Sequence, residues 1–179
     1  MATPTTLPAS FTAGQVLTAA QMNDLRGAFR VLQVVSTTKT DTFSSASTSF
    51  ADVTGLSATI TPSATSSKIL VFAQVSGSED YGVSAGFARL ARGATGINIG
   101  DTAGSRTSAT IQFDPPTTVT TVTAPIMFLD SPATTSATTY VVQVKTNSGS
   151  VFVNRSKTDT DNSSSARLSS TITVMEISA

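Results

Sequence analysis

From Val31 to the end of the chain, short runs of alternating apolar and hydroxyl residues are separated by turn signals. Successive side chains of a β-strand face opposite sides of a sheet, so each such run predicts a strand with one apolar face. Helical patterns do not alternate with these runs, which argues against an α/β scaffold. Short strands at this spacing predict a mainly β chain, folded as an antiparallel β-sandwich or jelly roll.

The expected strands cover most of the chain after residue 30. They are Val31–Thr38, Ser49–Val53, Leu56–Thr61, Lys68–Val75, Ala85–Ala91, Thr95–Ile99, Ala109–Phe113, Val119–Leu129, Thr139–Lys145, Ser150–Asn154 and Ser170–Ile177. The segments between them are rich in residues that favour tight turns. These turn signals are Thr54-Gly55, Pro62-Ser63, Ser76-Gly77-Ser78, Arg92-Gly93, Pro115-Pro116, Ser131-Pro132 and Asn147-Ser148-Gly149.

A different pattern precedes residue 31. Residues 1–17 are expected to form an extended arm, because Pro4 and Pro8 disfavour helix in the residues before them. Thr18-Ala19-Ala20-Gln21 then matches a capping box, in which the Thr and Gln side chains satisfy free amides at a helix start. We therefore expect an N-terminal anchoring arm with one short α-helix over residues 1–30 and a β-sandwich domain over residues 31–179.

The short helix is expected to carry an apolar stripe, whose members recur every three or four residues. They are Met22, Leu25, Phe29 and Leu32. A helix of about three turns is marginal alone in water, so the stripe needs a partner. Either the β-domain of the same chain or further copies of the helix can cover it, and the sequence leaves both open. The four residues are our candidates for oligomerisation or anchoring.

Uncharged hydroxyl residues fill the outward strand positions. The chain contains 26 Ser and 32 Thr, whereas 12% of its residues are charged, about half the roughly 25% of an average soluble domain. Segments 118–123 and 169–174 show this composition most clearly. Exposed sheets are usually protected by charge, especially by Lys. We therefore expect these faces to be partly covered by another subunit.

The composition also excludes several functions. The chain has no His, Cys or Trp, and its formal net charge is zero. These absences exclude His-dependent nucleophilic catalysis, disulfides and zinc–thiolate sites, and the neutral charge argues against nucleic acid as a partner. No apolar stretch approaches the ~20 residues that cross a bilayer. The N-terminus lacks the basic and apolar regions of a signal peptide, so we expect synthesis in a cytosol and no membrane insertion.

Carboxylates remain as candidates for catalysis, but their spacing nominates no acid–base pair. Thr158-Asp159-Thr160-Asp161-Asn162 is similar to the opening of a Ca²⁺ loop, yet it lacks the Gly and the distal Glu of an EF-hand. We interpret it as a solvated hairpin tip. The Gly-rich segments 93–96 and 100–104 lack the Lys-Ser/Thr of a phosphate-binding loop. We expect no catalytic residue, no cofactor and no metal ion, and hence a protein that is not an enzyme.

Two parts of the chain resemble proteins of tailed bacteriophages. Phe11-Thr12-Ala13-Gly14-Gln15-Val16-Leu17-Thr18-Ala19-Ala20-Gln21-Met22-Asn23 resembles a segment near the N-terminus of phage fibre and virion-appendage proteins. The later stretches 85–93, 128–132, 138–140 and 170–177 are similar to a group of phage structural proteins. The resemblance implies a homotrimeric virion appendage, anchored to another virion protein by its N-terminal arm. It implies a projecting β-domain similar to the jelly rolls of C1q/TNF-like trimers, and supplies no catalytic residue.

On this basis we expect a tail-fibre or spike protein, located in the virion and made in the host bacterial cytoplasm. Loops 77–83, 101–107 and 155–166 are the candidates for binding a host-surface glycan or protein, because such sites usually lie on loops. The candidate receptor-facing residues are Glu79, Asp80, Tyr81, Asp101, Arg106, Arg155, Asp159 and Asp161. Three alternatives stay open: a capsid decoration or cement protein, a glycan depolymerase, and a cellular C1q/TNF-like adhesion module.

Overall fold

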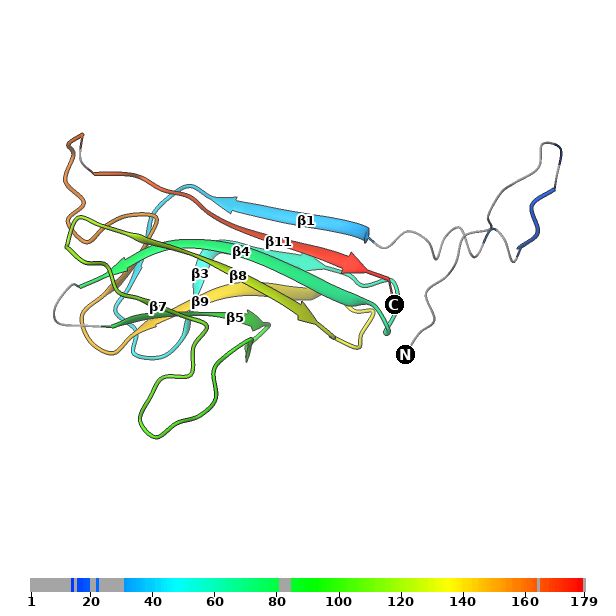
Figure 1. The fold of residues 1–179 in the computed structure, drawn as a ribbon, viewed down its shortest axis with the longest axis horizontal. Coiled ribbons are helices and arrows are strands. Elements are labelled where there is room, and N and C mark those ends of the chain that lie inside the picture. The colour runs from blue at the N-terminus through cyan, green and yellow to red at the C-terminus, as the bar shows by residue number, and fades with distance from the viewer. Residues whose placement is uncertain are drawn as a thin grey trace.

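The structure is a computed structural model that describes residues 14, 16–19, 22, 31–80, 85–163 and 165–178. From Val31 onward it is a sandwich of two antiparallel sheets (Figure 1), so the predicted fold class is confirmed. The strands are β1 (Val31–Lys39), β2 (Phe43–Ser45), β3 (Ala51–Ile60), β4 (Lys68–Glu79), β5 (Gly86–Arg92), β6 (Thr95–Ile97), β7 (Ile111–Phe113), β8 (Val122–Asp130), β9 (Thr138–Thr146), β10 (Val151–Val153) and β11 (Ser170–Ile177).

Each sheet consists of four rows, and a row holds either one strand or two strands that lie end to end. In sheet A, β1 and β2 form one edge row, β10 and β11 form the next, β4 follows, and β8 is the other edge. In sheet B the rows are β3, β9, β5, and then β6 with β7. The first row along the chain pairs with the last, the second with the seventh, the third with the sixth, and the fourth with the fifth. This nested pairing is that of a jelly roll.

The core lies between the sheets and follows from the alternation in the sequence. In β11, Ile172 and Val174 are buried, whereas Thr171 and Thr173, which alternate with them, are half-exposed. Phe113 of β7 reaches across to β4, where a Cβ on Gly77 would come within 2.7 Å of its ring. Gly77 therefore leaves room for the Phe113 ring against β4, and a larger residue would displace Phe113.

Several strand boundaries differ from the sequence-based expectation. Thr54-Gly55 does not end a strand: β3 is continuous, with a shift of register between Asp52 and Ser57 and a φ of +82° at Gly55. Such a bulge uses the same left-handed glycine as a turn, so the sequence signal is ambiguous. Ser76–Ser78 lies inside β4, residues 118–121 precede β8, and β2 was not predicted.

Little of the N-terminal segment is described. Ala19 and Met22 are helical, and the Met22 amide donates to the Thr18 carbonyl at 3.0 Å, which is one helical turn at the predicted start. Leu25 and Phe29 lie outside the described residues. Leu32 is the second residue of β1, so the predicted helical stripe was wrong in extending to it.

Asp130 ties the two sheets together at one end of the sandwich. This carboxylate ends β8 of sheet A and accepts hydrogen bonds from Tyr140 Oη at 2.7 Å and Arg92 Nη1 at 2.8 Å, both from sheet B. Burial, together with the hydrogen bond to Asp130, raises the pKa of Tyr140 well above its usual value. The phenol therefore stays protonated and acts as a permanent donor.

A second buried carboxylate, Glu176, holds the loop between β3 and β4. Its Oε1 accepts from the Ser63 amide at 2.7 Å, Ser63 Oγ at 2.6 Å and Ser67 Oγ at 2.7 Å, and its Oε2 accepts from Gln33 Nε2 at 2.7 Å. Burial alone would raise the pKa of Glu176, but the hydrogen bonds to the ionised form outweigh it and hold the pKa at about 2.

We predict that Glu176 makes the fold acid-sensitive. Because its pKa is lowered on folding, the ionised carboxylate stabilises the fold fully above its usual pKa of 4.5, and this contribution is lost as the pH falls towards about 2. Urea unfolding from pH 6 to pH 2 should show Glu176→Gln to be less stable than the native chain at pH 6 and to lose less stability on acidification. The exposed Asp114→Asn variant is the control. Equal pH slopes for Glu176→Gln and the native chain would contradict this role.

Candidate assembly face and distal loops

The outer face of sheet A is continuous across all four rows and carries no charge over its central part. Strand register places the side chains in three cross-strand lines, which together we call the assembly face. The first line is Val34, Met175, Leu70 and Leu129; the second is Ser36, Thr173, Phe72 and Met127; the third is Thr38, Thr171, Gln74 and Pro125.

Large apolar side chains on the assembly face are exposed in the single chain. The exposed fractions are 55% for Val34, 54% for Leu129, 66% for Met127 and 39% for Phe72. A shallow hollow of about 530 Å³ opens between Phe72, Met127 and Pro125. Contiguous exposed apolar surface of this kind marks an interaction site. It is therefore the candidate site that the geometry defines most clearly.

The hydroxyl residues of the assembly face satisfy one another. Ser36 Oγ and Thr173 Oγ1 are 2.8 Å apart, and Thr38 Oγ1 and Thr171 Oγ1 are 3.2 Å apart. Because these cross-strand pairs already share a hydrogen bond, covering them costs less than covering free hydroxyls would. This part of the face can thus be buried without charged partners.

The distal loops lie at the end of the sandwich opposite the start of β1 and the C-terminus (Figure 1). The largest is the distal excursion, residues 154–169, which leaves the sheet after β10 and returns to the same row at β11. Asn154 fixes its start: this buried residue has a φ of +62° and donates from Nδ2 to the Lys39 and Asp41 carbonyls, both at 2.9 Å. Its Oδ1 accepts from Ser170 Oγ at 2.7 Å, which joins the two ends of the excursion.

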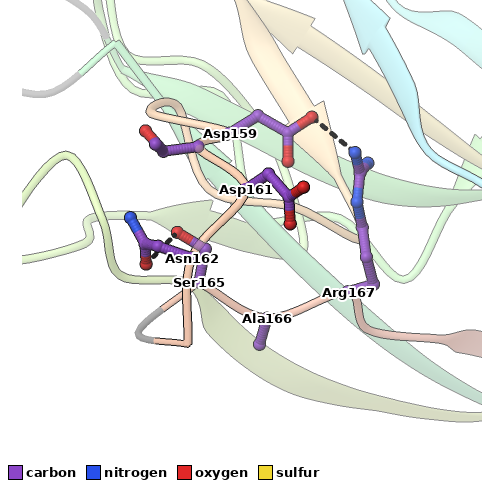
Figure 2. Close-up of a pocket in the computed structure, with 7 residues that line it drawn as sticks. Asp159, Asp161, Asn162, Ser165, Ala166 and Arg167 are labelled. Carbon is purple, nitrogen blue, oxygen red and sulfur yellow. Dashed lines mark hydrogen bonds and ion pairs between the residues drawn. The ribbon is translucent and has the colours of Figure 1, made fainter.

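A hollow of about 310 Å³ lies in the distal excursion, and Figure 2 shows the residues that line it. Asp159 Oδ2 lies 2.8 Å from Arg167 Nη2 and 3.6 Å from Arg155 Nη1. The negative charge of Asp159 is therefore neutralised by arginines of the same loop. Lys157 Nζ similarly pairs with Asp80 Oδ1 at 3.1 Å. Among the described residues, no group of three or more acidic side chains is placed to hold a metal ion.

The predicted receptor-facing residues fall into separate places. Asp80, Arg155, Asp159 and Asp161 lie at the distal end, and Tyr81 lies outside the described residues. Asp101 and Arg106 belong to the loop between β6 and β7, which extends from the edge of sheet B (Figure 1). Glu79 was wrongly placed in a loop, because it is the last residue of β4 and only 2% exposed.

The sequence analysis missed Phe72, Met127 and Leu129 as interaction residues. The signal was present: β8 carries apolar residues on both sides, with Ile126 and Phe128 directed to the core and Met127 and Leu129 directed outward. A strand with one face in contact with water usually carries polar residues on that face. The outward apolar residues of β8 were therefore a signal of a covered outer face.

Comparison with models of known protein families finds no match to this chain, and comparison with curated proteins finds none either. Over the part of the chain that the structure describes, no helix is long and apolar enough to span a membrane.

We predict that Asn154 determines the shape of the distal excursion. Asn154→Ala removes the donors to two backbone carbonyls, which should destabilise the fold by about 1–3 kcal/mol and make residues 154–169 more sensitive to protease. The measurements are the urea unfolding midpoint and limited proteolysis, with the exposed Thr160→Ala variant as the control. Native-like proteolysis of Asn154→Ala would show that the excursion is held by other contacts.

Proposed function

We propose that the chain is a structural protein of a tailed-phage virion and assembles as a homotrimer through the assembly face. The single observation that carries the proposal is the assembly face itself, which is charge-free and partly apolar. Burying such a face removes apolar surface from water at about 25 cal/mol per Å². A lone chain would leave this surface in contact with solvent.

Further copies of the same chain are the best partner for the assembly face. The face offers no charge to attract an anionic or cationic partner, and its mixture of methyl, thioether and hydroxyl groups is complementary to another surface of the same composition. The number of three copies comes from the resemblance to C1q/TNF-like trimers. The chain order supports an appendage, because the start of β1 and the distal excursion lie at opposite ends of the sandwich (Figure 1).

In this proposal the N-terminal arm attaches to another virion protein, and the distal end and the outer face of sheet B point away from the particle. Host attachment is then the role of the surfaces that the trimer leaves exposed. Neither catalysis nor a cofactor is part of the proposed function.

We predict that one charge on the assembly face prevents assembly without unfolding the chain. Leu129→Glu should change the sedimentation-equilibrium mass from three times 18.3 kDa to that of a single chain, because the carboxylate would be buried at the contact. Since Leu129 is 54% exposed in the single chain, the β circular-dichroism spectrum should not change.

Val119→Glu is the matched control, because Val119 is 47% exposed but lies in the loop before β8, away from the assembly face. A native chain that stays monomeric at micromolar concentration, or a Leu129→Glu variant that still forms trimers, would contradict the proposed contact.

The virion location is tested by electron microscopy of particles labelled with an antibody against the β-domain. The proposal predicts label on a tail or baseplate appendage. Label distributed over the icosahedral shell would indicate a capsid decoration protein instead, and absence of the chain from purified particles would overturn the virion assignment.

A further inference from the structure

A separate hollow of about 450 Å³ lies where the loop between β6 and β7 meets the outer face of sheet B. Its lining combines an aromatic ring, a guanidinium group, two amides and two hydroxyls. These groups belong to Phe87, Arg106, Gln112, Asn147, Ser105 and Thr107. Because the hollow is on sheet B, it is distinct from the assembly face.

Strand register extends the hollow along one line of side chains. Phe87 of β5 is paired with Gln112 of β7 on one side and with Lys145 of β9 on the other. Lys145 Nζ lies 6.0 Å from the centre of the Phe87 ring and 5.7 Å from the centre of the Phe50 ring. An ammonium group therefore stands between two aromatic rings, beside the hollow.

Two cations of this surface, Arg106 and Lys145, form no ion pair with any described residue. Within that part of the chain, the Arg106 guanidinium makes only a 3.4 Å hydrogen bond from Nη1 to the Ala103 carbonyl. Of the nearby acids, Asp52 accepts a 2.7 Å hydrogen bond from Gln143 Nε2, while Asp101 and Asp114 pair with neither cation. The distal hollow differs, because there Asp159 is paired with arginine.

The second amide of the lining is oriented by the backbone. Asn147 Oδ1 accepts from the Ala85 amide at 2.6 Å, which fixes the side chain and leaves Nδ2 as the donor available to a ligand. The side chain of Gln112 is exposed and makes no hydrogen bond within the described residues. The hollow thus presents amide donors and acceptors beside an aromatic ring.

We infer that this hollow binds a saccharide bearing a carboxylate. The Phe87 ring packs against the C–H face of a sugar, the amides and the hydroxyls of Ser105 and Thr107 pair with sugar hydroxyls, and the Arg106 guanidinium receives the carboxylate as a two-pronged donor. Lys145 adds a second positive charge. The inference rests on the proposed attachment role and names its ligand class and its site.

The test uses the purified full chain and immobilised oligosaccharides that contain glucuronate, galacturonate or N-acetylneuraminate, each beside its carboxyl-reduced counterpart. At least one acidic member should bind, and its reduced counterpart should bind about tenfold more weakly or not at all. Arg106→Gln and Lys145→Gln should each weaken binding about tenfold, and added salt should weaken it further. Arg167→Gln, which removes an exposed charge from the distal excursion, should leave binding unchanged.

Three results would overturn the inference: no acidic oligosaccharide binds, carboxyl reduction has no effect, or Arg167→Gln weakens binding as much as Arg106→Gln. Binding of polyglutamate as tight as that of the best saccharide would overturn the ligand class, because the site would then read charge alone. Sedimentation mass and particle labelling test the proposed function independently, so a trimer without saccharide binding would refute only this inference.

Discussion

Sheet A has apolar side chains on both faces, and the rest of the structure depends on this constraint. Its inner face packs against sheet B around Val71, Val75 and Val174, which are fully buried. Its outer face presents Leu129 and Met127 to solvent in the single chain. Each apolar side of a sheet costs free energy while it stays in contact with water, so covering both sides is favourable. The fold covers the first side, and in our proposal assembly covers the second.

Polar clusters at the two ends of the sandwich fix the loops around these apolar layers. Glu176 binds the Ser63–Ser67 loop at the end where the C-terminus lies, and Asn154 binds the start of the distal excursion at the other end. Both groups are buried and fully hydrogen-bonded, so they determine the backbone path rather than drive folding. Neither cluster includes the loop between β6 and β7, which lines the hollow that we propose as a saccharide site.

The sequence predicts the strands well where alternation is regular and fails where one residue type has two uses. Strand β11 is predicted with both ends correct, and hydroxyl and apolar residues alternate in its first half, from Thr171 to Val174. Gly55 was assigned to a turn because a bulge and a turn need the same left-handed conformation. Glu79 was assigned to a loop because the burial of a charged residue depends on partners that are distant in the sequence. The assembly face was missed because only strand register places Val34, Leu70 and Leu129 in one line. Arg106 was selected from the sequence, but Phe87, which lines the same hollow, and Lys145 beside Phe87 lie on strands that only the fold brings to this loop.

The central claim, that neighbouring copies cover the outer face of sheet A, is tested most directly by oxidation of Met127. This side chain is 66% exposed in the single chain, and a methionine thioether in contact with solvent is readily oxidised to the sulfoxide. Peptide mapping after dilute peroxide treatment gives its oxidation rate in the native chain, in Leu129→Glu and in a short Met-containing peptide. The account predicts slow oxidation of Met127 in the native chain and peptide-like oxidation in Leu129→Glu. Peptide-like oxidation of Met127 in the native chain would show that the face is open and would contradict the account.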